Sequence, residues 1–206
     1  KLLAREALVA VLARLREATP RPRIVLANGC FDGLHPGHQA YLDDARSRGD
    51  VLVVAVNSDA SVRTLKGARR PATPLAQRMR VLAALAAVDF VTCFEERTLD
   101  ATLRLLRPDV HAKGGDYTTQ SVPERELDAA LGIEIAICGG PKQHSSSALL
   151  AVEGADDRGA PARSGVGQRG ADRLFQERFH RPHRDLFRMA GAARAAAPSP
   201  RRRGSG

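Results

Sequence analysis

The chain has 206 residues, of which 43% are hydrophobic and 4% aromatic, and this length suits one domain of ordinary size plus extensions. Its net charge is +9, but 12 Arg and no Lys follow residue 150, so the first 150 residues carry only +3. This small charge does not indicate a domain that binds a specific nucleic acid. Three cysteines in or beside apolar runs predict a reduced, cytoplasmic protein, and neither a signal peptide nor an apolar run of roughly 20 residues suggests a secreted or membrane-spanning chain.

Helical and strand-like patterns alternate along the first 150 residues. Apolar residues at helical spacing predict an amphipathic N-terminal helix over 2–17, within a segment 1–20. Short apolar runs predict strands at 23–28, 51–56, 89–93, 109–113 and 133–137. Helices are predicted at 36–48, 58–65, 74–87, 98–107, 123–131 and 145–152. This alternation predicts an α/β fold over 21–152, a Rossmann-like doubly wound sheet of five parallel strands.

The pattern ends abruptly near residue 153. Gly, Ala, Arg, Pro and Ser dominate residues 153–206, which predicts a disordered low-complexity tail. A solvated tail is favoured over one that contacts RNA or a membrane, and the abrupt change also fits a shifted reading frame near residue 152. The coding DNA distinguishes these readings, because an uninterrupted homologous tail would exclude the shift.

The most informative segment follows the first strand. Residues 28–38 read Asn-Gly-Cys-Phe-Asp-Gly-Leu-His-Pro-Gly-His, so a glycine-bearing turn leads from a strand into a helix. His35 and His38 lie three residues apart in the first helical turn and therefore point to one side, where free backbone N–H groups favour a bound phosphate. Zinc is a weaker alternative, because Cys30 and the two histidines lack a fourth ligand at suitable spacing. We therefore predict no protein-bound metal cluster here.

These residues carry a resemblance to a known family. The segment 28–38 resembles the HxGH signature of the cytidylyltransferase-like nucleotidyltransferase superfamily. Further segments are similar to its heptose 1-phosphate adenylyltransferase branch, and they lie at residues 56–62, 65–67, 70–71, 74–79, 88–91 and 113–117. The resemblance covers residues 1 to about 150, and its specificity rests on the combination of segments.

The resemblance implies a reaction and a set of roles. AMP would pass from ATP to D-glycero-β-D-manno-heptose 1-phosphate with Mg²⁺, giving pyrophosphate and ADP-heptose, a precursor of the lipopolysaccharide core. The implied catalytic residues are His35, His38 and Lys66, and the implied phosphate-binding residues are Lys66, Arg70 and Arg78. The implied nucleotide-binding residues are Asn28, Gly29, Cys30, Phe31, Asp32, His35, His38, Lys113, Gly114, Asp116, Ser145, Ser146 and Ser147.

Two of these roles have structural alternatives. Asp32 could hold its own loop instead of a magnesium ion, and Arg78 could be an ordinary surface charge. The chain also departs from the family pattern at two places. Ser145–Ser147 stand where a Ser-Thr-Thr run is usual, and Ala76 stands where an acidic residue is frequent. Serine keeps the hydroxyl group, so the first departure preserves the chemistry.

Other functions remain open at this stage. One alternative is an enzyme similar to glycerol-3-phosphate cytidylyltransferase, because sequence alone does not separate ATP from CTP. Another is a non-catalytic module that binds a nucleotide, or RNA through the arginine-rich tail. The family resemblance also implies a homo-oligomer and a separate heptose kinase as partners. The first residue is Lys, which leaves open that the chain is a fragment of a kinase fusion.

Overall fold

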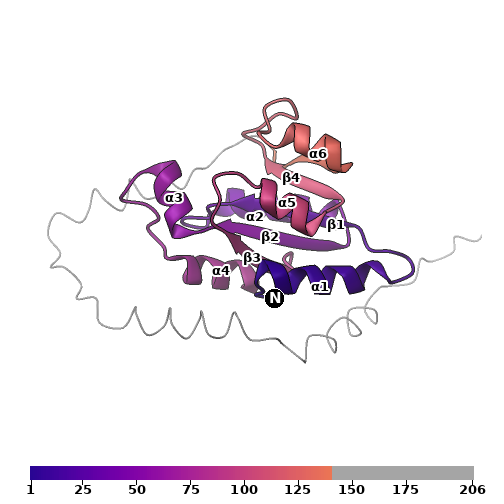
Figure 1. Ribbon diagram of the computed structural model, residues 1–206. Helices are drawn as coiled ribbons and strands as arrows, with labels where there is room; N and C mark the ends of the chain where they lie inside the picture. Colours follow the sequence, from indigo (N-terminus) through magenta and orange to yellow (C-terminus); the bar gives the residue numbers. More distant parts are fainter. Residues whose placement is uncertain (141–206) are drawn as a thin grey trace, which may run out of the picture.

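Five parallel strands form the centre of this computed structural model, which describes residues 1–140 (Figure 1). The strands are β1 (Ile24–Gly29), β2 (Val51–Asn57), β3 (Phe90–Phe94), β4 (Val110–Gly114) and β5 (Glu134–Cys138). Their order in the sheet is β3-β2-β1-β4-β5, and every neighbouring pair is parallel. The predicted α/β fold is confirmed. The predicted helix at 145–152, with Ser145–Ser147, and the predicted tail lie outside the described residues.

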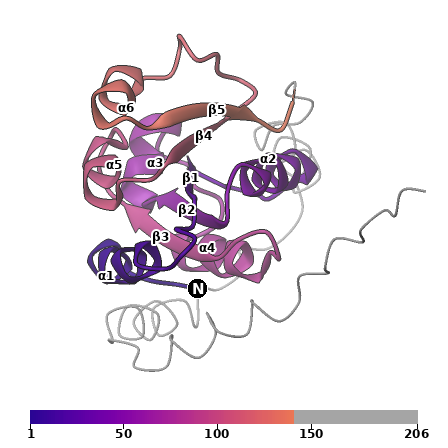
Figure 2. The ribbon, with the colours of Figure 1, turned by 90° about the vertical axis from the view of Figure 1, so that its right-hand side faces the viewer.

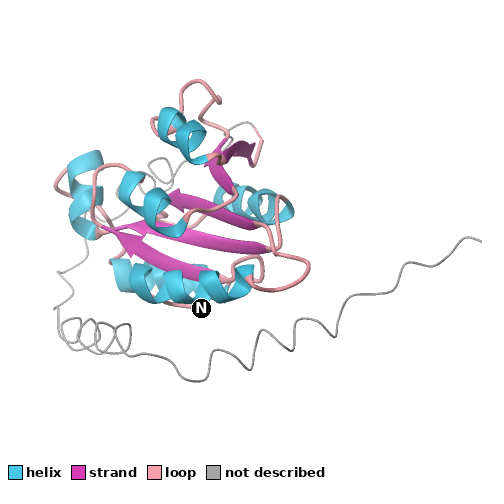
Figure 3. Cartoon of the chain, turned by 45° about the vertical axis from the view of Figure 1, so that its right-hand side comes forward, coloured by secondary structure: helices cyan, strands magenta, loops and turns pink. Residues whose placement is uncertain are grey.

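Helices cover both faces of this sheet (Figures 2 and 3). On one face lie α1 (Arg5–Arg16), α5 (Asp100–Leu106) and α6 (Arg125–Leu131), and on the other lie α2 (Pro36–Ser47) and α4 (Leu75–Ala84). The remaining helix, α3 (Asp59–Lys66), directly follows the carboxyl end of β2. Within residues 1–140, none of these helices is both long and apolar enough to cross a membrane.

The strand β2 shows why the sheet is buried on both sides. All seven of its residues are buried. Val51, Val53 and Ala55 pack with α1 and α5, whereas the alternate residues 52, 54 and 56 pack with α2 and α4. Since side chains alternate across a strand, a continuous apolar run needs an apolar layer on each face.

The N-terminal residues differ from the prediction. The helix predicted over 2–17 begins only at Arg5, so the prediction was wrong at its start. The backbone N–H of Val91 donates to the carbonyl of Lys1, and the N–H of Leu3 donates to the carbonyl of Val91. An edge strand presents unpaired backbone groups. Residues 1–3 therefore pair with β3 instead of forming a further helical turn.

The strand order places the switch point between β1 and β4. The first three strands extend the sheet in one direction, and β4 then returns to the other side of β1. Loops therefore diverge from the carboxyl ends of β1 and β4, which leaves a crevice where ligands of such sheets bind. The ends concerned are Asn28–Gly29 and Lys113–Gly114.

Candidate active site

A cavity of about 850 Å³ opens at this switch point, a volume in the range of small-molecule sites. Ten of the predicted site residues line it: Asn28, Gly29, Cys30, Phe31, His35, His38, Lys66, Lys113, Gly114 and Asp116. Three predicted residues, Asp32, Arg70 and Arg78, are not part of this lining. The structure therefore separates the predicted residues into a group that faces the cavity and a group behind it.

The two histidines lie together at the start of α2. His35 is the N-cap residue of α2, Pro36 is the first helical residue, and His38 follows in the first turn. The imidazole rings stack with their centroids 3.8 Å apart and their planes 27° from parallel. Both residues line the cavity at the N-terminus of a 12-residue helix. This arrangement concentrates hydrogen-bond donors and partial positive charge on one spot.

The turn before the histidines is shaped by Phe31. This residue has a left-handed backbone with φ of 50°, and Gly33 follows with φ of 77°. The Phe31 ring is buried and lies 5.3 Å from the ring of His38, centroid to centroid. A Cβ atom on Gly29 would approach this ring to 3.2 Å, so glycine leaves room for the aromatic ring that packs beside His38.

Tyr41 joins the two strands at the switch point. Its hydroxyl donates to the carbonyl of Ala112 at 2.8 Å and accepts from the backbone N–H of Asn28 at 3.3 Å. Burial raises the pKa of this phenol well above its ordinary value, so the hydroxyl keeps its proton and can serve both neighbours. The sequence prediction missed Tyr41, although its position one turn after His38 on α2 suggests a location near the site.

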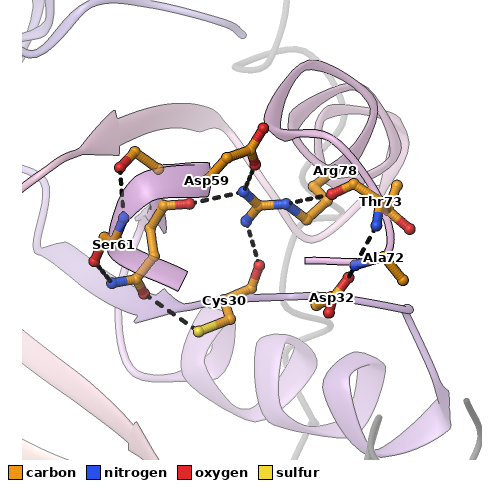
Figure 4. Close-up of polar contacts among 9 residues, drawn as sticks. Cys30, Asp32, Asp59, Ser61, Ala72, Thr73 and Arg78 are labelled. Carbon is orange, nitrogen blue, oxygen red and sulfur yellow. Dashed lines mark hydrogen bonds and ion pairs between the residues drawn. The ribbon is translucent and has the colours of Figure 1, made fainter. Parts of the chain in front are cut away.

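Asp32 holds the loop that follows α3. Its buried carboxylate accepts a hydrogen bond from the guanidinium of Arg70 at 2.9 Å. It also accepts from the backbone N–H groups of Ala72 at 2.8 Å and Thr73 at 3.0 Å (Figure 4). Burial alone would raise the pKa of Asp32, but these donors outweigh it and lower the pKa below its ordinary value. Of the two predicted alternatives for Asp32, the structure shows the loop-holding contacts.

Arg78 lies in the interior and is not a surface charge, since only 1% of the residue is exposed. Its guanidinium donates to the carbonyls of Cys30, Asn57 and Thr73 and to the carboxylate of Asp59 at 2.6 Å (Figure 4). These contacts link the HxGH turn, the end of β2 and the loop before α4. Direct contact of Arg78 or Arg70 with a phosphate stays a prediction.

Two lysines lie on the cavity wall in different surroundings. Lys66 ends α3 and is exposed. Lys113 is buried, donates to Glu124 at 3.1 Å and lies over the ring of Tyr117, 4.9 Å from its centroid. Burial tends to raise the pKa of Glu124, but the Lys113 ammonium outweighs this effect and lowers it. Lys113 is therefore held in place, whereas Lys66 lies exposed at the end of α3.

Comparison with known proteins agrees with this geometry. Residues 26–144 match the family model described as Cytidylyltransferase-like. The chain belongs to the cytidylyltransferase-like family. This match runs from β1 past the end of β5, so it includes every described element that lines the cavity.

Curated relatives of this cytidylyltransferase-like chain are much longer than the matched part. The bifunctional protein HldE of Alkalilimnicola ehrlichii is 51% identical over 128 residues, which are 62% of this chain and 27% of that protein. HldE of Hahella chejuensis is 53% identical over 113 residues, which are 55% of this chain and 24% of that protein. The chain thus spans about a quarter of the length of these relatives.

A solved structure also matches the chain. The crystal structure of the lipopolysaccharide core biosynthesis protein from Thermoplasma volcanium is 30% identical, with a TM-score of 0.48. The alignment covers 56% of this chain and 93% of that one.

The cytidylyltransferase-like site contains residues that the sequence prediction did not name. Arg97 and Thr98 follow β3 and line the cavity, and Glu124 lines it from the start of α6. The rule that ligands bind at carboxyl ends of strands could have identified Arg97, because it lies three residues after β3. Within residues 1–140, no three His, Cys, Asp or Glu side chains are grouped so as to hold a metal ion.

Proposed function

We propose that this domain transfers AMP from ATP to the phosphate of D-glycero-β-D-manno-heptose 1-phosphate, giving ADP-heptose and pyrophosphate. The observation that carries the proposal is the stacked pair His35 and His38 at the N-terminus of α2, facing a cavity at the switch point of the sheet. Imidazole and backbone donors on one spot suit a phosphate that gains charge during the reaction. Membership of the cytidylyltransferase-like family supports the same class of chemistry.

The reaction needs positioning and charge stabilisation more than covalent catalysis. An oxygen of the sugar phosphate forms a bond to the α-phosphorus of ATP, and the bond from that phosphorus to the bridging oxygen of the β-phosphate breaks. Pyrophosphate leaves with the electron pair of the broken bond. His35 and His38 donate to the phosphate oxygens that gain charge, and Lys66 and Lys113 add positive charge at the cavity wall.

Mg²⁺ would enter this site with the nucleotide. Magnesium keeps several waters and is usually held by one or two carboxylates plus substrate phosphates, so the absence of a three-residue cluster among residues 1–140 fits it. Asp116, which lies just after β4 in the cavity lining, is the residue that would hold it together with the nucleotide phosphates. The bound ion would neutralise charge on the phosphates and the leaving pyrophosphate.

The choice of substrates rests on segments around the cavity. The runs at 56–62, 65–67 and 113–117 resemble the heptose 1-phosphate adenylyltransferases, and parts of each lie in the lining: Asn57, Leu65, Lys66 and residues 113–117. A heptose 1-phosphate and ATP are therefore the pair we propose. An enzyme similar to glycerol-3-phosphate cytidylyltransferase would have the same histidines but would prefer CTP and glycerol 3-phosphate.

Pyrophosphate release tests the proposal directly. The full chain is assayed with Mg²⁺, each nucleoside triphosphate and a panel of sugar phosphates that includes heptose 1-phosphate and glycerol 3-phosphate. We expect turnover with ATP and heptose 1-phosphate. Turnover only with CTP and glycerol 3-phosphate would assign the other branch, and no turnover with any pair would overturn the enzymatic proposal.

A variant pair tests the role of the histidines. His38→Ala should lower turnover by at least about a hundredfold, as the loss of a donor to a charged transition state does. Gln39→Ala, an exposed neighbour on the same helix, is the matched control and should keep turnover within about twofold. Circular dichroism verifies that both variants stay folded. A near-normal rate in folded His38→Ala would contradict the proposed chemistry.

A further inference from the structure

Two buried ionic pairs connect β4 with α6 behind the cavity. His111 and Asp128 are both fully buried, with the imidazole Nδ1 2.8 Å from a carboxylate oxygen. Lys113 and Glu124 form the second pair at 3.1 Å. The partners are two residues apart on the strand and four apart along the helical segment, so both pairs lie on the same side of the sheet. Such buried pairs are costly unless their remaining hydrogen-bonding groups have partners.

His111 and Lys113 converge on one amide. Nε2 of His111 lies 3.4 Å from Oδ1 of Asn28, and the Lys113 ammonium lies 3.3 Å from the same oxygen. An ammonium only donates hydrogen bonds, so the amide atom that faces Lys113 must be the oxygen. This contact fixes the orientation of the Asn28 amide, because the positions of amide oxygen and nitrogen are assigned from their hydrogen bonds. The Nδ2–H groups then occupy the other arm of the amide, on a residue that lines the cavity.

Both ring nitrogens of His111 face oxygen atoms, Nδ1 the Asp128 carboxylate and Nε2 the Asn28 amide oxygen. Because Lys113 fixes the amide oxygen on this side, Nε2–H is the donor in the contact between His111 and Asn28. Neither His111 nor Asp128 lines the cavity, so their contact with any ligand passes through Asn28.

We propose that His111, held by Asp128, is a positioning residue for nucleotide binding. Together with Lys113 it fixes the Asn28 amide so that Nδ2–H donates to a phosphate oxygen of the nucleotide in the cavity. Without the Nε2 donor, the amide can turn its oxygen toward the phosphate, where the two oxygens repel each other and the hydrogen bond is lost. This inference rests on the proposed function only in taking a nucleoside triphosphate as the ligand.

The affinity for a non-reactive nucleotide tests this inference. The probe is α,β-methylene ATP with Mg²⁺, because its bridging carbon blocks transfer, and isothermal titration calorimetry of the full chain gives Kd. The double substitution His111→Leu with Asp128→Leu removes both polar partners and leaves no lone buried charge. We expect Kd to rise about tenfold, the usual effect of losing one hydrogen bond to a charged group. Thr92→Val, which alters a buried hydroxyl without a hydrogen-bond partner among residues 1–140, is the control and should leave Kd unchanged.

Two further comparisons distinguish a positioning role of His111 from a general structural effect of its substitution. The pair His111→Gln with Asp128→Asn keeps an amide donor toward Asn28 and an internal hydrogen bond, so Kd should return to within about threefold of the wild type. In an Asn28→Ala background, the double Leu substitution should have no further effect, because the amide it positions is gone. If the double Leu variant does not fold, His111→Phe with Asp128→Leu serves, since it keeps an aromatic ring on β4 but removes both polar partners.

The outcomes are distinct. A double Leu variant that folds and binds within twofold of the wild type would overturn the inference, as would effects that simply add to those of Asn28→Ala. A wild-type chain that binds the probe but shows no turnover with any substrate pair would overturn the proposed reaction and leave the positioning role standing. A wild-type chain that does not bind the probe would overturn both.

Discussion

Replacement of Arg78 by methionine decides between an internal and a phosphate-binding role for this side chain. Methionine keeps most of the apolar stem of arginine but removes all of its donors. Four hydrogen bonds are lost, three to backbone carbonyls and one to Asp59. The partners lie on the HxGH turn, the end of β2, the loop before α4 and the first turn of α3. The substitution therefore removes the contacts that connect these four segments.

The expected loss of stability follows from these contacts. Breaking a buried ion pair by removing one partner costs about 3–5 kcal/mol. Asp59 keeps a third of its side chain exposed, so water replaces part of what it loses, whereas the three carbonyls are left with weaker partners. We therefore expect about 4 kcal/mol, a large share of the about 5–15 kcal/mol that stabilises a typical domain. Arg78→Lys keeps the charge but reaches fewer acceptors, and we expect about half of this loss.

Urea denaturation followed by far-ultraviolet circular dichroism measures the effect. With a slope of about 2 kcal/mol per molar urea, the midpoint for Arg78→Met should fall by roughly 2 M. Arg80→Met, an exposed position on the same helix, should stay within about 0.5 kcal/mol of the wild type. A loss below about 1 kcal/mol, combined with a large fall in turnover, would refute the internal role and favour direct contact with phosphate.

Three further substitutions test other parts of the structure. The hydrogen-bond donors around Asp32 lower its folded-state pKa. The free energy of unfolding of the wild type should therefore exceed that of Asp32→Asn by its full amount above about pH 4, and this difference should shrink as the pH falls further. A difference that stays constant from pH 6 to pH 3 would contradict this. Gly49→Ala should cost about 1–3 kcal/mol in urea unfolding, since its Cβ would lie 2.7 Å from the carbonyl oxygen of Arg23, and an unchanged midpoint would refute that clash. Leu12→Ala should cost about 2–5 kcal/mol, because the side chain is fully buried between α1 and the sheet; a loss below 1 kcal/mol would show that α1 is not integral to the domain.

The fold was predictable because its signals are local. A short apolar run such as residues 51–56 is typical of a strand buried on both faces. Five such runs separated by helices leave few other topologies. The cavity-facing residues were predictable for a related reason. His35, His38, Lys66 and Lys113 each lie at or just beyond an element end, and carboxyl ends of parallel strands meet at one edge of the sheet.

The contacts behind the cavity were not predictable, because they join residues far apart in sequence. The Asp32 carboxylate meets donors 38 to 41 residues away, and His111 meets Asn28 across 83 residues. The partners of Arg78 were likewise not predictable, because Cys30, Asn57 and Asp59 lie 48, 21 and 19 residues away from it.

The basic residues near the switch point thus divide into two groups with different tasks. Arg70, Arg78 and His111 are bound to carboxylates of the protein itself, whereas Lys66 and the two HxGH histidines line the cavity, and Lys113 belongs to both groups. Charges of the first kind hold the turn, the loop and Asn28 in fixed positions, and a carboxylate that neutralises each of them reduces its pull on a ligand. The affinity for an anionic ligand therefore rests on fewer side chains than the count of basic residues in the motifs suggests, and these few act in a frame that buried ion pairs keep rigid.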